Sequence, residues 1–172
     1  SFFFPSSAIF EGKLEFGLVI FSKLPILRQE SFLNNSMGHS EGFIYADIKI
    51  DSSVIRVFNF HTESPGFRKD EYSEKGGVKI SKSILGRLKN NYQFRNSQVA
   101  FMKQHINKSP FPVIVCGDLG DVPNSFAYFH LKEGMNDAFL KKGTGLGRTY
   151  RYLSPTLRID YLFASKDLNI FN

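Results

Sequence analysis

Hydrophobic and polar residues alternate in several short stretches of the chain, with the period of two that is typical of half-buried strands. One polar turn, Asp51-Ser52-Ser53, separates two such stretches and predicts a hairpin. The alternating stretches and several short apolar runs together predict strands over residues 2–4, 17–22, 43–50, 54–60, 112–116, 159–165 and 168–171.

A different period marks the stretch from Lys79 to Ile106, where apolar residues recur every three or four positions. This spacing predicts a long helical region made of one helix or two. A short helix is predicted from Asn124 to Leu131, with Asn124 or Ser125 as its N-cap. Because hairpins and helices are mixed along 172 residues without repeats, low-complexity segments or long linkers, we expect a single α+β domain.

The first candidate for chemistry is Asp118, which ends the short apolar strand PVIVCGD. Turn-forming residues follow it, including Gly120, Pro123 and Asn124. An enzyme would place a catalytic carboxylate at such a strand end. From these residues alone, a carboxylate that only caps the turn is an equally good interpretation.

Two other predicted strands carry polar groups in similar positions. In LRIDYLFAS, Arg158 and Asp160 alternate with apolar residues, so both face away from their apolar neighbours. The strand VIRVFNF delivers His61 at its end. Three predicted strands therefore each hold a polar side chain at or near one end.

Four segments, taken together and in order, resemble motifs of the endonuclease/exonuclease/phosphatase superfamily. These are metal-dependent phosphoesterases that include DNase I-like nucleases, sphingomyelinases and inositol-polyphosphate phosphatases. The stretch GLVIFSKLPI resembles the family strand that ends in Ser-basic-x-Pro-Ile, and FNFHTES resembles its Asn-x-His strand. The stretch VIVCGDLGDVPNS resembles its Gly-Asp-Phe-Asn segment, and LRIDYLFAS resembles its Arg-Ile-Asp-Tyr strand.

The resemblance implies a DNase I-like fold, a four-layer α/β/β/α sandwich of two mainly antiparallel sheets with helices outside. It also implies that His61 would help to hold the scissile phosphate, that Asp118 would ligate the metal and act on the attacking water, and that Asp160 would orient a catalytic histidine. The expected metal is Mg²⁺ or Mn²⁺, since Mg²⁺ prefers hard oxygen ligands and takes only one or two protein carboxylates. One cysteine and four scattered histidines argue against a dedicated zinc site.

The sequence departs from the family pattern in two ways. The Ser-Asp-His segment that carries the catalytic histidine, the metal-binding glutamate and an early asparagine are not found in it, so we expect an incomplete domain, the central and C-terminal portion of a longer one. Gly120 stands where the family has asparagine, and the loss of one preorganised donor typically costs about a hundred- to a thousandfold in turnover. Asn124 or a water would have to replace that donor, although the position of Asn124 favours a role in the turn.

The charge distribution suits an anionic substrate without requiring one. The chain has 22 Lys and Arg against 16 Asp and Glu, which gives a net charge of +6. The basic residues between Lys75 and Lys108 fall on a predicted helix, where a solvated outer face is favoured over a nucleic-acid or phospholipid surface. Near the glycines of residues 143–147, Arg148 is a candidate for a phosphate-facing rim, and a mobile loop is at least as good an interpretation. The residues predicted to bind substrate are Gly120, Asn124, Arg148 and Arg158.

The leading prediction is a divalent-metal-dependent phosphoesterase that cleaves a phosphodiester or phosphomonoester with an activated water. The alternative is a non-catalytic member of the fold that binds an anionic partner, either nucleic acid or a phospholipid surface. A purely structural piece is the third possibility. No apolar run reaches the roughly 20 residues of a membrane span. The substrate, the oligomeric state and the compartment stay open, and a cytoplasmic and a membrane-anchored parent chain both fit the sequence.

Overall fold

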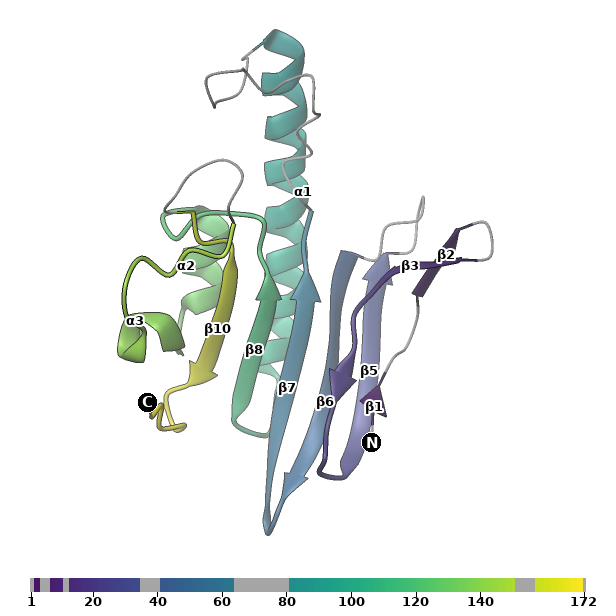
Figure 1. Ribbon diagram of the computed structural model, residues 1–172, viewed down its shortest axis with the longest axis vertical. Coiled ribbons are helices and arrows are strands. Elements are labelled where there is room, and N and C mark those ends of the chain that lie inside the picture. Colours follow the sequence, from purple (N-terminus) through teal and green to yellow (C-terminus); the bar gives the residue numbers. More distant parts are fainter. Residues whose placement is uncertain are drawn as a thin grey trace.

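The computed structural model describes residues 2–3, 7–10, 13–34, 41–63, 81–150 and 157–171. Its centre is a six-stranded sheet with the order β5-β6-β7-β8-β10-β9 (Figure 1). Every neighbouring pair is antiparallel except β7 and β8, which run parallel. The strands are β5 (Ile26–Asn34), β6 (Glu41–Ile50), β7 (Ser53–His61), β8 (Val113–Asp118), β9 (Met135–Asp137) and β10 (Asp160–Ser165).

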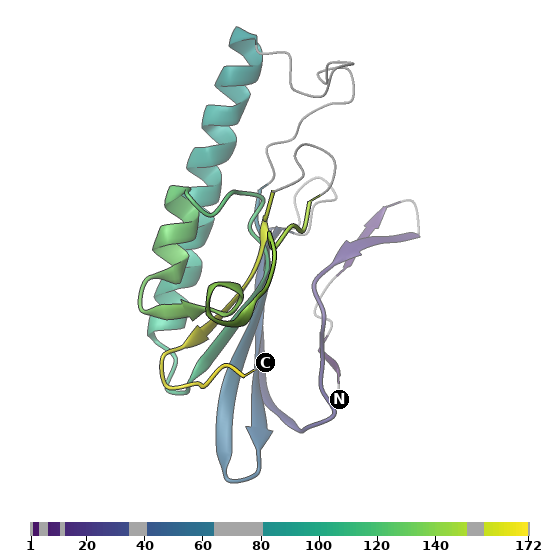
Figure 2. The same cartoon turned by 60° about the vertical axis from the view of Figure 1, so that its left-hand side comes forward.

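Two helices cover one face of this sheet, and the N-terminal strands lie on the other side (Figure 2). The long helix α1 (Lys82–Asn107) packs beside α2 (Phe126–Lys132), while the short α3 (Ala138–Lys142) contacts β9 and β10. The main core fills the space between these helices and the sheet. Its fully buried members include Phe58, Phe60, Val99, Met102, Val115, Leu131 and Phe163.

Each helix begins at a side chain that accepts a backbone N–H of its first turn. Ser81 caps α1 and Asp137 caps α3. The Ser125 hydroxyl accepts the N–H of Tyr128 at 3.2 Å, so Ser125 is the N-cap of α2 and Asn124 lies in the turn before it. The region predicted as one helix or two is a single helix of 26 residues. Within the described ranges, no helix combines the length and the apolarity needed to cross a bilayer.

A second, smaller core lies on the sheet face away from the helices. It consists of Leu18, Ile20, Ile44, Ala46 and Ile48. Asn59 of β7 ties the N-terminal segment to this face by donating its side-chain amide to the Val19 carbonyl oxygen at 3.0 Å. The same segment forms two short two-stranded sheets, β1 (Phe2–Phe3) with β4 (Ile20–Phe21) and β2 (Ser7–Phe10) with β3 (Lys13–Gly17). The α+β class is confirmed, and the described residues form three layers: helices, main sheet and short strands.

The structure corrects several predicted elements. The strand expected over residues 168–171 is not formed, because the Leu168 N–H donates to the Ser165 carbonyl oxygen and closes a turn after β10. The strand expected over 17–22 shortens to β4, while the one expected over 112–116 continues to Asp118. The hairpin after Ile50 is confirmed, and Phe4 lies outside the described residues. The elements that the prediction missed are β2, β3, β5, β9 and α3.

The basic residues of α1 do not all face solvent, so the predicted solvated face is correct only in part. Lys82 and Lys89 are exposed, but Arg95 and Lys103 are buried. Lys103 Nζ donates to the Leu131 carbonyl oxygen at 3.1 Å and also to that of Glu133, which joins α1 to the end of α2. Burial lowers the pKa of Lys103.

Candidate functional site

The strand register brings His61, Asp118 and Asp160 into one row at one end of the main sheet. His61, the last residue of β7, pairs with Asp118, the last residue of β8. Asp118 pairs on its other side with Asp160, the first residue of β10. The three predicted catalytic residues are therefore neighbours on adjacent strands, at the upper end of the sheet in Figure 1.

All three side chains belong to the sheet face that is turned away from the helices. Phe60 and Tyr161, the strand neighbours of His61 and Asp160, are buried in the core under the helices. Because successive side chains of a strand point to opposite faces, His61 and Asp160 point to the other face. His61 is half-buried and Asp160 is exposed.

Backbone hydrogen bonds fix the ends of these strands to one another. The Thr62 N–H donates to the Asp118 carbonyl oxygen at 3.1 Å, and the Thr62 hydroxyl donates to that of Leu119 at 2.8 Å. On the other side, the Leu119 N–H donates to the carbonyl oxygen of Ile159 at 2.8 Å. The backbone that carries Asp118 is thus hydrogen-bonded to the end of β7 on one side and to the start of β10 on the other.

Glycine permits a close approach of β7 and β8 next to the row. Gly117 has φ of 155°, and a Cβ atom at this position would lie 2.0 Å from the Phe60 carbonyl oxygen. Any larger residue would force the two strand ends apart. The glycine of the Gly-Asp pair is thus required by the distance between the strands that carry His61 and Asp118.

The surroundings of Asp118 affect the pKa of its carboxyl group in opposite directions. Its Oδ1 accepts the N–H of Gly120 at 2.7 Å. Burial raises the pKa of the Asp118 carboxyl and the charge of Asp160 adds to this, while the Gly120 N–H, His61 and Arg95 act against it. The net result is a raised pKa, so Asp118 is a better proton acceptor than an exposed aspartate.

Comparison with known proteins assigns the chain to a family. The model of the Endonuclease/Exonuclease/phosphatase family matches residues 2–172. The chain belongs to this family. The family assignment that the four motifs predict is thereby confirmed, and superfamily members are mostly hydrolases. A search of curated protein sequences found no match.

Solved structures share the fold at low sequence identity. A beta-hairpin deletion mutant of beta toxin from Staphylococcus aureus has 18% identity, a TM-score of 0.57, and coverage of 89% of this chain and 55% of that one. The mannosyl-6-phosphatase of Bacteroides thetaiotaomicron has 14% identity, a TM-score of 0.57, and coverage of 96% of this chain and 63% of that one. Sphingomyelinase C from Streptomyces griseocarneus has 16% identity, a TM-score of 0.53, and coverage of 87% of this chain and 52% of that one. Another beta toxin mutant was solved with bound magnesium ions. The chain thus spans little more than half the length of most of these relatives.

Two of the four residues predicted to bind substrate, Gly120 and Asn124, lie in the segment that connects Asp118 to α2. Gly120 has φ of 59° and offers its N–H to the Asp118 carboxylate, as described above. Asn124 is exposed in the turn that precedes α2. Its position fits the expected role in the turn, and a contact with substrate stays a prediction.

Arg148 lies near the Asp160 end of the row. The adjacent Thr149 accepts the N–H groups of Ile159 and Asp160 on its hydroxyl oxygen, at 3.0 and 3.1 Å. This fixes the backbone next to Arg148 against the start of β10. The Arg148 side chain is exposed, so its predicted place on a phosphate-facing rim is compatible with its position.

Arg158 is placed differently from the prediction. Its guanidinium is buried and forms a two-pronged ion pair with Asp137, with Nη1 to Oδ1 at 3.0 Å and Nη2 to Oδ2 at 2.8 Å. The rings of Phe139 and Tyr161 lie against it, 4.9 and 4.7 Å from the guanidinium carbon. Because its charge is neutralised inside the protein, Arg158 has a structural role and is not placed to bind substrate.

The segment that resembles the family's Ser-basic-x-Pro-Ile motif is also not part of this row. Ile26 pairs with Ile48, which pairs with Ile55. These residues lie at the opposite end of the sheet from His61. Ser22 there makes a local turn, since its hydroxyl accepts the Leu24 N–H at 3.0 Å.

A buried polar network behind the row was not predicted. Arg95 of α1 donates to the Glu63 carbonyl oxygen and to Asp121, and Gln98 accepts the Glu63 N–H. The sequence did indicate that Arg95 is buried, because Arg95 precedes the apolar Val99 by four residues and Met102 by seven. Residues at this spacing lie on the same face of a helix, here the apolar face.

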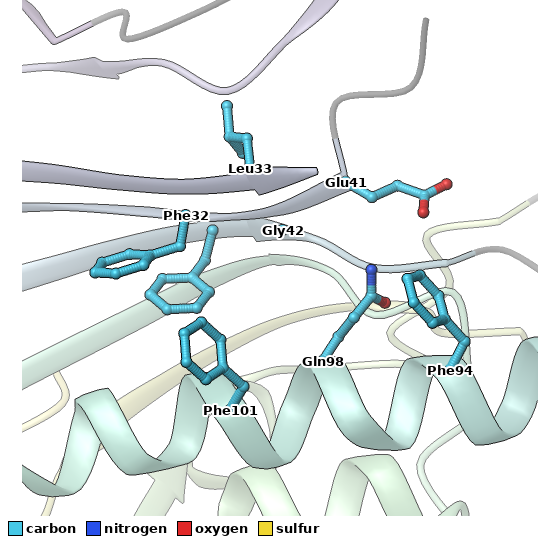
Figure 3. A pocket seen from close by; sticks show the side chains of 8 residues that line it. Phe32, Leu33, Glu41, Gly42, Phe94, Gln98 and Phe101 are labelled. Carbon is cyan, nitrogen blue, oxygen red and sulfur yellow. The ribbon is translucent and has the colours of Figure 1, made fainter. Parts of the chain in front are cut away.

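An apolar pocket of about 310 Å³ lies between β6 and α1, on the helix side of the sheet (Figure 3). It is lined by Phe32, Leu33, Glu41, Gly42, Phe43, Phe94, Gln98 and Phe101. Burial raises the pKa of Glu41 to about 8, and a hydrogen bond with Glu63 acts in the same direction. Since His61 and Asp160 point to the other face, this pocket does not belong to the row.

The row fits a hydrated divalent cation better than a fully protein-ligated one. It offers the carboxylates of Asp118 and Asp160 on adjacent strands. No group of three or more His, Cys, Asp or Glu side chains that could surround a metal occurs in the described part of the chain. Mg²⁺ commonly keeps several waters and binds one or two carboxylates, so the donor set is chemically suitable for it.

Proposed function

We propose that this protein is a divalent-metal-dependent phosphoesterase that hydrolyses a phosphodiester or phosphomonoester with an activated water. The observation that carries the proposal is the row of His61, Asp118 and Asp160 on one face of the sheet. Membership of the Endonuclease/Exonuclease/phosphatase family supports the same class of reaction. Because the chain spans only part of its relatives' length, the proposal concerns the complete protein.

The chemistry requires a group that accepts a proton from water and groups that balance the charge of the phosphate. Asp118 would take the proton, for which its raised pKa and its fixed orientation by the Gly120 N–H are suitable. His61, one strand away, would donate a hydrogen bond to the phosphate. Asp160 would orient a catalytic histidine, as the family resemblance implies.

A metal would complete the charge balance. Mg²⁺ or Mn²⁺ held by Asp118 and by water ligands would supply charge neutralisation at the phosphate oxygens. The magnesium seen in a beta toxin structure and the common use of divalent metals among family members support this part of the proposal.

The substrate is proposed only as a class. Two structural relatives are named as a mannosyl-6-phosphatase and a sphingomyelinase C, so the shared fold is found with both a phosphomonoester and a phosphodiester substrate. An exposed Arg148 near Asp160 fits an anionic ligand of either kind.

The test is metal-dependent hydrolysis of an aryl phosphodiester and an aryl phosphomonoester by the complete protein. We expect Asp118→Asn, which keeps the shape of the side chain, to lower turnover by about a thousandfold, in the range that loss of an acid–base group produces. The matched control is Asp167→Asn, since Asp167 is an exposed carboxylate in the turn after β10. Full turnover in Asp118→Asn would contradict the assignment.

Gly120 motivates a second candidate, a non-catalytic member of the fold that binds an anionic partner. The position lacks the side-chain amide that the family motif has. Since φ is 59° there and asparagine tolerates this region better than other non-glycine residues, Gly120→Asn is expected to fold. Hydrolysis that appears only in Gly120→Asn, together with partner binding that weakens steeply with salt, would favour this candidate.

A further inference from the structure

Arg95 reaches from the middle of α1 to the two loops that follow the strands of His61 and Asp118. Its side chain is 0% exposed. Its Nε donates to the Glu63 carbonyl oxygen at 2.8 Å, and its Nη1 donates to Asp121 Oδ2 at 2.8 Å. Glu63 is two residues beyond His61, and Asp121 is three residues beyond Asp118. One guanidinium therefore connects the two strand ends.

The same contact extends to the third strand of the row through Asp121. This residue is 5% exposed, and its Oδ1 accepts the N–H of Val122 at 2.9 Å. Its carbonyl oxygen accepts the hydroxyl of Tyr161 at 2.9 Å, and Tyr161 is the neighbour of Asp160 in β10. Each strand that supplies a residue of the row is thus linked to Arg95, directly or through Asp121.

Gln98 adds a second contact from the same face of α1. Its Oε1 accepts the Glu63 N–H at 2.9 Å, while Arg95 holds the Glu63 carbonyl oxygen. Residues three apart on a helix lie on the same side, so two side chains of α1 can hydrogen-bond to the N–H and to the carbonyl oxygen of Glu63 at once. The segment that leaves His61 is therefore fixed in position by the helix.

The burial of Arg95 is costly for a residue that only fills space. Its Nη2 is buried and has no hydrogen-bond partner among the residues that the structure describes. The ring of Tyr92, 5.0 Å from the guanidinium carbon, offsets only part of the lost hydration. Well-packed apolar residues can often replace a buried ion pair without loss of stability, so stability alone does not account for a buried charge here.

We propose that Arg95 is a positioning residue, whose guanidinium holds the loops after β7 and β8 at the spacing that sets His61 against Asp118. The expected effect of Arg95 on catalysis rests on the proposed function, because it can be measured only if the protein hydrolyses a phosphoester. The structural consequence, a fixed junction between the two strand ends, does not depend on any activity.

The fold contains a matched control for the loss of a buried arginine. Arg56 forms a two-pronged ion pair with Asp47, at 2.6 and 2.8 Å, and both side chains are buried. Arg56 lies at the level of Val113, at the start of β8, and so five residues away from Asp118. Arg56→Met therefore removes the same kind of buried, ion-paired group from β7, away from the row.

The kinetic test compares Arg95→Met, Arg95→Lys and Arg56→Met in the complete protein. We expect Arg95→Met to lower kcat about a hundredfold and to change KM much less, because misplacement of reacting groups by about 1 Å has effects of this size. Arg95→Lys is expected to recover part of the loss, since an ammonium group keeps one charged contact with Asp121. Arg56→Met should keep kcat within about threefold of the starting protein, even where its loss of stability is comparable. Equal losses of kcat in Arg95→Met and Arg56→Met would overturn the proposal.

Hydrogen exchange of single amides tests the junction without any substrate. The amides that report on it are Thr62 N–H, bonded to Asp118, and Leu119 N–H, bonded to Ile159. We expect both to exchange at least tenfold faster in Arg95→Met and in Arg95→Lys, after correction for global stability, and neither to change in Arg56→Met. Unchanged exchange at both amides in Arg95→Lys would refute the positioning role, and this variant decides the matter if Arg95→Met does not fold. If the starting protein hydrolyses no phosphoester, the proposed function fails while the exchange data still test Arg95.

Discussion

Among single residues, Asp118 and Glu41 show how burial acts on carboxyl groups in two different settings. Burial raises the pKa of the Asp118 carboxyl, and the Gly120 N–H that it accepts and the neighbouring His61 oppose part of this rise. Glu41 is buried next to another carboxyl group, that of Glu63, and its pKa rises to about 8. The first setting therefore offsets part of the cost that burial adds to ionisation, whereas the second adds to that cost.

This difference predicts a pH-dependent stability that originates from Glu41. Its pKa is about 8 in the folded protein and 4.5 for the ordinary side chain. Between these values the folded state keeps a proton that the unfolded state releases, so the free energy of unfolding falls as the pH rises from about 4.5 to about 8. We expect Glu41→Gln to raise the free energy of unfolding by on the order of 2 kcal/mol at pH 9 and to have little effect at pH 4.

Urea unfolding of Glu41→Gln at a series of pH values measures this effect. Glutamine keeps the size of the side chain and can donate a hydrogen bond to Glu63. The control is Asp167→Asn, an exposed carboxylate whose removal should leave the pH dependence unchanged. A variant Glu41→Gln with the same pH dependence as the starting protein would rule out Glu41 as its source.

Among the secondary-structure elements, the parallel pair β7 and β8 determines the geometry of the candidate site. Their side chains alternate between the face covered by the helices and the opposite face, and both strands end at the row. β7 could be predicted from its alternation of apolar and polar residues, β8 from its short β-branched apolar run, and β10 from the alternation at its start followed by an apolar end. β5 is exposed at many positions and β9 has only three residues, so neither has a pattern that distinguishes it from a loop.

Two glycine substitutions test the close approach of β7 and β8. A Cβ atom on Gly117 would overlap the Phe60 carbonyl oxygen, whereas one on Gly86 in α1 would have no neighbour within 4 Å. We therefore expect Gly117→Ala to lower the free energy of unfolding by about 2–4 kcal/mol, since backbone strain is added to a steric clash. Gly86→Ala should raise it by about 0.5–1 kcal/mol through helix propensity. Thermal or urea unfolding of both variants measures the difference, and equal effects of the two would show that the approach of the strands is not constrained.

For the whole molecule, the sequence predicted the residues of the row better than the contacts that support it. His61, Asp118 and Asp160 were identifiable because each stands at a strand end within a motif. Arg95 and Arg158 were misjudged because a charged residue was assumed to face solvent or substrate. Both are instead buried against an aspartate that is distant along the chain, Asp121 for Arg95 and Asp137 for Arg158. The position of Arg95 on the apolar face of its helix indicates burial, but the identity of the paired aspartate depends on the tertiary fold and cannot be read from the local sequence.

Arg158 and Arg148 provide the last prediction, because they were expected to share a role and the fold separates them. Arg158 holds the fully buried Asp137, which also accepts the hydroxyl of Tyr128 and caps α3. Arg158→Met would leave this carboxylate without its charge partner, and we expect the free energy of unfolding to fall by about 3–5 kcal/mol. Arg148→Met removes an exposed side chain and should cost less than about 1 kcal/mol.

The kinetic effects of the two variants should be the reverse of their effects on stability. If Arg148 borders the phosphate, Arg148→Met raises KM for a phosphoester substrate in the complete protein. Arg158→Met, assayed at a temperature at which it stays folded, should leave KM within about threefold, because its guanidinium lies between aromatic rings and a carboxylate inside the protein. Urea unfolding and steady-state kinetics on both variants separate the two roles. A raised KM in Arg158→Met without a loss of stability would restore Arg158 as a substrate-binding residue and would mean that its ion pair with Asp137 opens when substrate binds.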